Sequence, residues 1–592
     1  MLNEAVLHMT KSPYVSVEDK NSICVRLRIK KGDAQFCFVV YHDRYNVWYS
    51  KKVQMRKTDS DMLYDYYEAS VGRFTKRIEY QFCILSNDGC SYWYGNKGIS
   101  TDGFQAGTFQ FPYLYGRTDR LPEWVNNAVV YQIYPDSFFD GDQGNNPGDL
   151  QRWGSKPNGK SYYGGDLKGI IKKLGHLSSL GVNVLYLNPI FMAASPHRYN
   201  TVDYYKIDPS LGDIETFDEL VSYCHKKGIK VILDGVFNHI GSESEIFKDV
   251  IENGEKSRYA GWFNIYSFPV TTSPVPNYET FSNNIGTMPK IFTDNPEVQD
   301  YFLKIAEFWT KRDIDGWRLD VANELDRAFI VRFRDAVKSI KPDALIIGEI
   351  MHEADEWIGE NGLDGVTNQP VYNAIVDFFA RKSTGVVEFD NRLASNRAGY
   401  KSGACSGHFI YIGNHDQERF YTKCKDYSNN DSGYGRDEFD TARMKLAILF
   451  KMTYVGIPVI YYGDEIGMEG GNDPDCRRSM VWSRKKQNKE IFEFYKKLIK
   501  YRKHYNALKK GDFKRLLLIP SDNVYGYLRC DGDQKIAVFI NNSPSVRELE
   551  IDADWAGQKK AVLKDLIGDN EYFINKGILE LKLEPYSGVM LE

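Results

Sequence analysis

The sequence predicts a multidomain α/β protein: a central (β/α)8 (TIM) barrel with an inserted loop subdomain after its third strand, an N-terminal β-sandwich and a C-terminal all-β domain. Two observations predict this architecture. Through the middle of the chain, short apolar runs alternate with longer amphipathic stretches, whereas both ends carry short strand patterns separated by turn residues. The length of 592 residues agrees, because single cores rarely grow beyond about 300 residues.

The N-terminal region, residues 1–120, reads as β-structure. Its segments ICVRLRIK (from Ile23), FCFVVYH (from Phe36) and IEYQFCIL (from Ile78) alternate or run apolar, and Gly, Asp and Asn residues separate them. This pattern predicts a β-sandwich. The polar segment from Gly116 to Trp124, GRTDRLPEW, is the expected linker to the next domain.

Residues 121–508 contain eight candidate strands, which predict a closed barrel. Amphipathic helical patterns fill most of the intervals, as in the segments that begin at Leu167, Phe217 and Val298. The strands are AVVYQIYP from Ala128, VNVLYLNP from Val182, IKVILDGVF from Ile229, DGWRLDV from Asp315, ALIIGEI from Ala344, DGVTN from Asp364, GHFIYIGNHD from Gly407 and GIPVIYYGDE from Gly456.

Two further regions complete the predicted organisation. The interval after the third strand, residues 239–290, is long and rich in Tyr, Phe, Ser and Asn, so we expect a small inserted subdomain or a functional loop there. Residues 509–592 return to short alternating strands and predict a C-terminal β-sandwich.

Composition and charge exclude several classes of function. The net charge of −4 and the even mixture of signs argue against a nucleic-acid or anionic-membrane partner, since either would require a basic face. No apolar stretch approaches about 18 residues, and the N-terminus lacks the pattern of a secretory signal. Nine cysteines without a C-x-x-C pair favour free thiols in a reducing compartment. We therefore expect a cytoplasmic protein.

Polar residues gather where the predicted barrel strands end. The third strand ends at Asp234 and is followed by Asn238 and His239, and the fourth ends with Arg318 and Asp320. The fifth ends at Glu349, and the seventh is followed by Asn414, His415 and Asp416. Active sites of such barrels form at this rim, and four polar strand ends together are improbable as mere caps.

Two carboxyl groups at one rim suit the hydrolysis of a glycosidic bond. Arg318 and Asp320 are two residues apart, so both side chains leave the strand on the same side. Arg318 should therefore hold Asp320 ionised, as a nucleophile requires. Glu349 follows the apolar run LIIG, which should desolvate it and favour a protonated general acid. A retaining mechanism requires the two carboxyl groups to lie about 5 to 5.5 Å apart.

The motifs that carry these residues resemble the α-amylase superfamily, glycoside hydrolase family 13. DGVFNH, GWRLDVANE, GEI and GNHD stand in the order of its four signature regions. MPKI (Met288 to Ile291), VANE and GDEIGMEGGNDPDCRR resemble the branch of neopullulanases, cyclomaltodextrinases and maltogenic amylases. The resemblance covers nearly the whole chain, including both terminal β domains. It implies hydrolysis of α-1,4 bonds in cyclodextrins, maltooligosaccharides and pullulan-like α-glucans through a covalent glycosyl-enzyme intermediate.

The resemblance also implies roles for individual residues. Asp320 is the implied nucleophile, Glu349 the acid/base and Asp416 the third carboxylate, which stabilises the transition state. Arg318, His239 and His415 are expected around the scissile bond, with Tyr199 stacked under the sugar. Asp473 and Arg477 match residues that bind sugars further along the non-reducing side; a surface ion pair is the alternative reading.

A calcium site is a further expectation. The segments FFDGDQGNNPGD and YYGGD offer oxygen donors that suit Ca²⁺ in a structural role, and the family's calcium loop has a similar pattern. The alternative is an Asp/Asn/Gly turn without an ion. The candidate ligands are Asp140, Asp142, Asn145, Asn146, the Gly164 carbonyl and Asp166.

Three alternatives remain open at this stage. A non-catalytic sugar-binding protein on the same scaffold is disfavoured, because all three carboxylates are present. A transglycosylase would use the same intermediate, with the outcome set by acceptor-side residues such as Met351, where close relatives often carry Trp, and Glu324. The N-terminal domain either binds polymeric glucan or forms a homodimer that covers the partner's cleft, and we favour the homodimer.

Overall fold

The computed structural model describes residues 1–19, 21–72, 77–111, 121–282, 284–359, 362–430, 439–557 and 561–592, with the backbone alone for 426–430. Most of the expected linker 116–124 therefore lies outside the described residues, as does part of the segment after the seventh barrel strand, residues 431–438. The chain divides into two units, which are described separately: Met1–Arg120 with His352–Glu360 and Thr384–Cys405, and the remainder, which begins at Leu121.

The first unit contains the predicted β-sandwich. One sheet has the order β1-β2-β6-β5 and the other β4-β3-β7-β8-β9, with β10 paired to β7. The three segments predicted as strands correspond to β2, β3 and β7. The bounds are β1 Val15–Val17, β2 Ser22–Lys30, β3 Ala34–Asp43, β4 Asn46–Gln54, β5 Arg56–Ser60, β6 Tyr64–Gly72, β7 Ile78–Ser86, β8 Ser91–Gly95, β9 Gly98–Ser100 and β10 Phe109–Gln110; a short helix α1, Gly103–Ala106, precedes β10.

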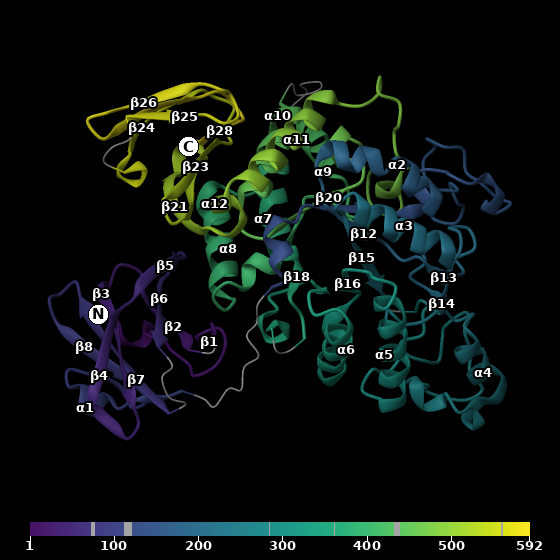
Figure 1. Ribbon diagram of the computed structural model, residues 1–592, viewed down its shortest axis with the longest axis horizontal. Helices are drawn as coiled ribbons and strands as arrows, with labels where there is room; N and C mark the ends of the chain where they lie inside the picture. The colour runs from purple at the N-terminus through teal and green to yellow at the C-terminus, as the bar shows by residue number, and fades with distance from the viewer. Residues whose placement is uncertain are drawn as a thin grey trace. The chain divides into compact units, whose positions relative to one another are not determined.

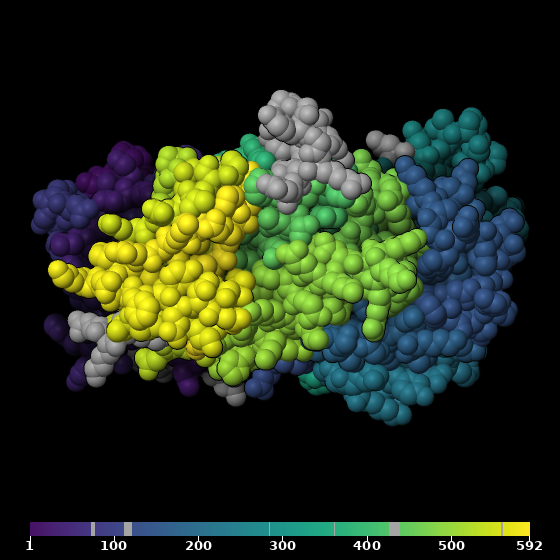
Figure 2. Space-filling view, turned by 90° about the horizontal axis from the view of Figure 1, so that it is seen from above, coloured from purple at the N-terminus to yellow at the C-terminus, as the bar shows by residue number. Residues whose placement is uncertain are grey.

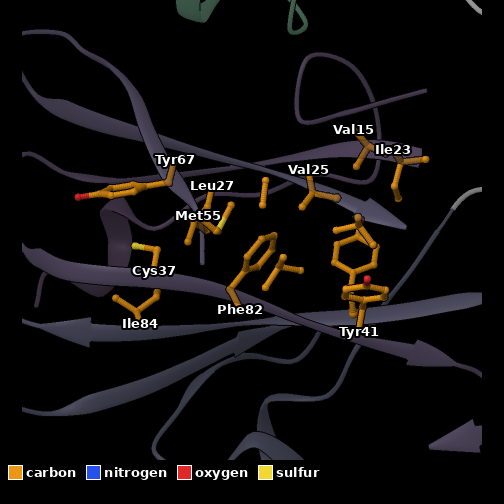
Figure 3. Packing of buried hydrophobic residues seen from close by; sticks show 14 of the residues in the cluster. Val15, Ile23, Val25, Leu27, Cys37, Tyr41, Met55, Tyr67, Phe82 and Ile84 are labelled. Atoms are coloured by element: carbon orange, nitrogen blue, oxygen red, sulfur yellow. The ribbon is translucent and has the colours of Figure 1, made fainter. Parts of the chain in front are cut away.

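The core of this unit lies between its two sheets. Val25 and Leu27 of β2 point toward Phe82 of the opposite sheet, and all three are fully buried (Figure 3). Helix α8 (Val386–Ala398) belongs to the same unit although it comes from the middle of the chain. Its Arg397 makes a two-pronged ion pair with Asp59 at 2.7 and 2.9 Å, the geometry in which arginine binds carboxylates most strongly.

The second unit contains the closed parallel barrel, with all eight predicted strands in sequence order. Six of the eight are buried from end to end, as expected for strands covered on both faces. Gly365 shows how closely they pack, because a Cβ there would lie 2.0 Å from the Gly407 carbonyl oxygen. The strands are β11 Val130–Ile133, β12 Val184–Leu187, β15 Lys230–Gly235, β16 Gly316–Leu319, β17 Leu345–Ile350, β18 Gly365–Asn368, β19 Phe409–Ile410 and β20 Ile457–Tyr461.

Helices follow most of these strands and surround the barrel (Figure 1). The first, α2, shows why the sequence folds locally as it does: the Asp166 side chain accepts the Gly169 N–H at its start, and Gly181 takes the left-handed conformation at its end. The helices are α2 Leu167–Leu180, α3 Ile214–Lys226, α5 Pro296–Thr310, α6 Arg327–Ile340, α7 Gln369–Ile375, α9 Phe420–Asn430, α10 Asp440–Thr453, α11 Lys489–His504 and the short α12 Asn506–Lys510.

Two segments between barrel strands form additional structure outside the barrel. The interval 239–290 contains helix α4 (Glu245–Asn253) and pairs its backbone at isolated bridges such as His239 with Lys290. A two-stranded sheet, β13 (Phe191–Ala193) with β14 (Thr201–Ile207), follows the second barrel strand. The sequence did not predict this pair.

The C-terminal region forms two four-stranded antiparallel sheets, as predicted. Figure 2 shows this yellow domain directly against the green segment that holds α10 and α11. The first sheet has the order β21-β22-β23-β28 and the second β24-β27-β26-β25. The bounds are β21 Asp512–Ile519, β22 Val524–Asp531, β23 Gln534–Asn541, β24 Arg547–Asp552, β25 Val562–Lys564, β26 Glu571–Asn575, β27 Ile578–Leu583 and β28 Ser587–Leu591.

The nine cysteines all lie within the described part of the chain, and none of them forms a disulfide. Six of the nine are buried. Among the described helices, none is both long and apolar enough to cross a bilayer.

Candidate active site

Arg318 joins three carboxylates from neighbouring barrel strands. Its Nη1 lies 2.6 Å from Asp234 Oδ1 and 2.8 Å from Asp320 Oδ1, and its Nη2 lies 2.7 Å from Glu349 Oε1. Because β15, β16 and β17 are adjacent and parallel, their carboxyl ends bring these groups to one rim. The structure therefore brings Asp320 and Glu349 together, as the sequence predicts.

Strand register explains how closely Asp320 and Glu349 approach. Asp234 pairs with Arg318 between β15 and β16, and Leu319 pairs with Gly348 between β16 and β17. If this register continues by one residue, Asp320 lies beside Glu349. Adjacent strands in a sheet are about 4.8 Å apart. The backbone N–H of Val321 also donates to Glu349 Oε2 at 3.3 Å.

The charges of this cluster do not balance, since one guanidinium faces three carboxyl groups. Burial raises the pKa of Asp320 well above its usual range; Arg318 opposes that shift, and the negative charges of Glu349 and Asp234 add to it. Burial likewise raises the pKa of Asp234. The prediction that Arg318 holds Asp320 ionised leaves out two further carboxylates, Glu349 and Asp234, which compete for the same cation.

A hydrogen-bond network connects this cluster to His415. Tyr199 donates to Asp234 Oδ2 at 3.0 Å, and its hydroxyl also contacts His415 Nε2. Gln132 Nε2 lies 3.0 Å from His415 Nδ1. Since the Gln132 amide nitrogen can only donate, the network assigns the imidazole proton to Nε2. Burial lowers the pKa of His415 well below its usual value, and Arg477 and Arg318 add to that effect, so the ring is neutral.

The ring of Tyr199 is stacked on that of His415, with centroids 5.3 Å apart and planes within 5° of parallel. His197 stacks on Tyr199 at 6.1 Å, and its Nδ1 accepts the Tyr199 N–H at 3.1 Å. Burial lowers the pKa of His197 to about 4, and the charges of Arg477 and Arg198 contribute. The sequence did not single out His197; its position two residues before Tyr199 was the available signal.

Asp416 extends the network toward solvent. Its Oδ2 lies 3.2 Å from His415 Nε2, its Oδ1 lies 3.2 Å from Arg477 Nη2, and its side chain is 39% exposed. Arg477 also binds Asp473 at 2.9 Å and donates its Nε–H to the His415 carbonyl at 2.8 Å. The structure therefore places Asp473 and Arg477 close to Asp416, and the two residues form an ion pair with each other.

His239 lies in a different environment. Its ring is fully buried and stacks on Phe281 of the inserted segment at 4.6 Å. Burial lowers its pKa to about 3, so this ring is also neutral. Both histidines predicted at the rim can therefore offer or accept a hydrogen bond, and neither supplies a positive charge.

Several supporting residues were missed as site residues in the sequence. The sequence indicates Asp234 only as a strand end, yet it shares the Arg318 guanidinium. Tyr186 donates to Asp234 at 2.8 Å, and Asn188 connects Gln132 with Tyr199 at 3.1 and 3.0 Å. A polar residue within an apolar strand, such as Gln132 in AVVYQIYP, was the available signal.

The predicted calcium loop divides into two groups. Asp142 accepts hydrogen bonds from Lys168 and Gly144, and Asp166 accepts them from Gly141, Asp142 and Gly169, so these carboxylates have protein partners. In contrast, one side-chain oxygen each of Asp140, Asn145 and Asn146 is buried with no hydrogen-bond partner in the described chain. The described residues contain no cluster of three acidic, His or Cys side chains arranged for a metal.

Comparisons with known proteins agree with this geometry. Models of the alpha amylase catalytic domain, the alpha amylase N-terminal ig-like domain and the maltogenic amylase C-terminal domain match residues 132–511, 1–115 and 515–590. The chain is 42% identical to neopullulanase 2 of Thermoactinomyces vulgaris over 100% of this chain and 99% of the relative. It is 44% identical to a cyclomaltodextrinase of Thermoanaerobacter pseudethanolicus over 92% and 93% of the two chains. A solved cyclomaltodextrinase structure superposes with a TM-score of 0.92 at 36% identity, covering 100% of both chains.

The fold, the carboxylate cluster and these similarities together define an α-glucan glycoside hydrolase. The chain belongs to the α-amylase family, glycoside hydrolase family 13.

Proposed function

We propose that the protein is a retaining hydrolase of α-1,4-glucosidic bonds, with Asp320 as nucleophile, Glu349 as general acid/base and Asp416 as the carboxylate that stabilises the transition state. The observation that carries this proposal is the sharing of the Arg318 guanidinium by Asp320 and Glu349 on adjacent strands. Retention requires a close pair of carboxyl groups, and the strand register favours such a pair.

In the first step, an Asp320 oxygen attacks the anomeric carbon while Glu349 gives its proton to the glycosidic oxygen. The carbon–oxygen bond to the leaving sugar breaks, and a glycosyl ester of Asp320 forms. In the second step, Glu349 takes a proton from water, the water oxygen attacks the same carbon, and the ester bond to Asp320 breaks. The product keeps the α configuration because the carbon inverts twice.

The remaining groups of the site bind and orient the sugar. Tyr199 presents a ring face for the apolar face of a glucosyl unit, and its hydroxyl is fixed by Asp234 and Asn188. His415, neutral with its proton on Nε2, is a hydrogen-bond donor beside Asp416. Arg477 and Asp473 would contact the next sugar on the non-reducing side.

The test combines a variant with product analysis. Glu349→Gln should abolish turnover of maltotriose while leaving its binding measurable by calorimetry. The native protein should release the α-anomer first, as followed by NMR. An initial β-anomer would overturn the retaining mechanism, and binding without turnover in the native protein would favour the non-catalytic alternative.

For substrates, we propose cyclodextrins, maltooligosaccharides and pullulan-like α-glucans. The names of the relatives, neopullulanase and cyclomaltodextrinase, support this range. Met351, just past Glu349, is 52% exposed and offers a flexible apolar surface to the leaving group or to an acceptor sugar. A product profile on the three substrates decides between hydrolysis and transfer, since early oligomers longer than the substrate indicate transfer.

We also propose a structural Ca²⁺ at the loop after β11. The buried side-chain oxygens of Asp140, Asn145 and Asn146 fit the all-oxygen ligand set of calcium. Gly164 fits as well, because a Cβ there would lie 2.4 Å from Asn146 Oδ1, so only glycine leaves room for this close approach. Asp142 and Asp166 would support the loop through their hydrogen bonds. The ion would hold the loop together and take no part in the chemistry.

We propose that the protein forms a homodimer through its N-terminal domain. Strand β4 is an edge strand, and Val47, Trp48 and Tyr49 project exposed apolar side chains from it, Trp48 with 91% exposure. An exposed edge with large aromatic residues is a surface that a second copy can cover symmetrically.

We further propose a cytoplasmic location. Two observations support it: none of the nine cysteines forms a disulfide, and one relative is named intracellular maltogenic amylase, of Bacillus subtilis.

A further inference from the structure

The short turn that follows Asp320 is directly connected to the acid/base residue. Val321 adopts a left-handed conformation with φ of 44°, and its N–H donates to Glu349 Oε2 at 3.3 Å. β-branched residues rarely take this conformation, and they keep it only where the surrounding contacts impose it. The 3-10 turn Ala322–Glu324 follows at once, so its position decides where the Val321 N–H points.

The far end of this turn is held by Lys290. The Lys290 ammonium lies 2.8 Å from Glu324 Oε2 and 3.3 Å from Glu279 Oε1. Lys290 and Glu279 both belong to the segment inserted after β15, and the Lys290 N–H donates to the Glu279 carbonyl at 3.0 Å. The Lys290 side chain is 21% exposed and that of Glu324 is 41% exposed, so the lysine is partly buried while its partner lies at the surface.

Lys290 therefore connects the inserted segment to the turn that carries the Val321 N–H. A second contact runs in parallel, since the Asp326 N–H donates to Thr293 Oγ1 at 2.8 Å. With the turn held at both of these points, the Glu349 carboxyl has a fixed donor on Oε2 and a fixed cation, Arg318, on Oε1.

We propose that Lys290 is a positioning residue for the general acid: by fixing the turn 321–324 through Glu324, it orients the Glu349 carboxyl toward the leaving-group oxygen. This inference rests on the proposed role of Glu349. Proton transfer depends steeply on the position of the acid, and small displacements reduce rates by about tenfold or more. The lysine itself does not touch substrate or the reacting atoms.

This role makes a prediction that general structural damage does not share. Maltotriose needs a proton on its departing oxygen, whereas fluoride leaves from α-maltosyl fluoride with little help from an acid. Lys290→Met should therefore lower kcat on maltotriose by about tenfold with little change in KM. The first-turnover burst of fluoride, which precedes the step in which Glu349 acts as base, should stay within about twofold of the native rate.

The matched control is Lys248→Met, which removes an exposed lysine paired with Glu245 at 3.1 Å on helix α4 of the same inserted segment. It should change neither rate. Equal loss on both substrates in Lys290→Met, or no loss on either, would overturn the inference. Lys290→Arg, which keeps the charge, should recover most of the maltotriose activity.

If Lys290→Met does not fold, as judged by circular dichroism, Glu324→Gln provides the same test, because it weakens the contact from the other side. It should lower kcat on maltotriose selectively and leave KM unchanged. An unselective effect, or a rise in KM from a lost contact between Glu324 and the acceptor-side sugar, would overturn the inference. The native protein tests the proposed function separately. If the native chain does not cleave maltotriose with the help of an acid, both the proposed role of Glu349 and the role of Lys290 fail.

Discussion

At the scale of single residues, the site is governed by the shortage of positive charge around Arg318. Three carboxyl groups bind one guanidinium, and all of these side chains are at most 11% exposed. Such a cluster retains a proton more readily than isolated carboxylates do, because each ionised member opposes ionisation of the next. Retaining hydrolysis requires this situation, with one carboxylate ionised and a neighbour protonated.

The raised pKa of Asp320 gives a prediction for the pH dependence. Asp320 must be ionised to attack, and its pKa lies above the usual value of about 4 because of burial, with Glu349 and Asp234 adding to the shift. As the pH falls, kcat/KM on maltotriose should therefore begin to decrease above pH 4. An acidic limb below pH 4 would contradict this assignment.

The histidines provide a control for the same measurement. Burial lowers the pKa of His239 to about 3 and that of His197 to about 4, so neither ring gains a proton in the working range. His197→Gln should change KM while leaving the acidic limb where it was. A shift of that limb would mean that an imidazole, and not the carboxylate cluster, titrates there.

Much of the site could be predicted because strand geometry is regular. The spacing of Arg318 and Asp320 fixes their common face, and Glu349 ends the next strand. The contributions of Asp234 and Gln132 could not be predicted in the same way. Their roles depend on hydrogen bonds to residues 84 and 283 positions away, which only the closed barrel creates.

At the scale of elements, the two ends of the barrel have different roles: one holds the active site and the other a stabilising network. Asp315 precedes β16 at the end opposite to the active site. It binds His225 at 2.7 Å, Lys230 and Lys341 at 2.9 Å each, and the Val231 N–H at 2.9 Å. Burial would raise its pKa, but these hydrogen bonds prevail and lower it. This network contributes to stability and takes no part in the chemistry, which occurs at the other rim.

Asp315→Asn should therefore lower the free energy of unfolding at pH 7 by about 2 to 3 kcal/mol. A depressed carboxyl pKa stabilises the folded state above the unfolded-state value near 4, and this contribution is lost as the pH falls below it. Denaturant unfolding at pH 7 and pH 3 should show the difference shrinking at the lower pH. Asp313→Asn is the control, because Asp313 also pairs with Lys341 but is 68% exposed. Equal effects of both variants would contradict the assignment.

The loop after β11 provides the metal prediction. If Asp140, Asn145 and Asn146 bind Ca²⁺, a chelator should lower the melting temperature, and added Ca²⁺ should restore it by mass action. Asp140→Ala should lower the melting temperature in calcium and abolish the response to the chelator. A native protein whose melting temperature is unchanged by chelator and by calcium would instead favour a turn that needs no ion.

The elements themselves were largely predictable. All eight barrel strands and both terminal β domains follow from apolar periodicity, which burial on both faces or on one face imposes. The β13–β14 pair was missed because β13 has only three residues and the register between the two strands is irregular. The assignment of α8 to the N-terminal unit could not be read from the sequence either, since its ion pair with Asp59 connects residues 338 positions apart.

At the scale of the whole molecule, the exposed edge strand β4 gives a prediction about assembly. Light scattering should show a dimer for the native chain, and Trp48→Lys combined with Tyr49→Lys should produce a monomer. Phe104→Lys is the matched control, because Phe104 is as exposed as Trp48 but lies outside β4. A native monomer that binds granular starch would support the alternative, a glucan-binding surface.

Retaining hydrolysis requires Asp320 to form a covalent bond to the sugar, and trapping that bond is the direct measurement. The Glu349→Gln variant should react with α-maltosyl fluoride but lack the base for the second step, so the glycosyl-enzyme should accumulate. Mass spectrometry of a peptide digest should then find one maltosyl unit on the peptide containing Asp320, and none after Asp320→Asn. A label on a different carboxylate, or fluoride release without any labelled peptide, would contradict the central claim.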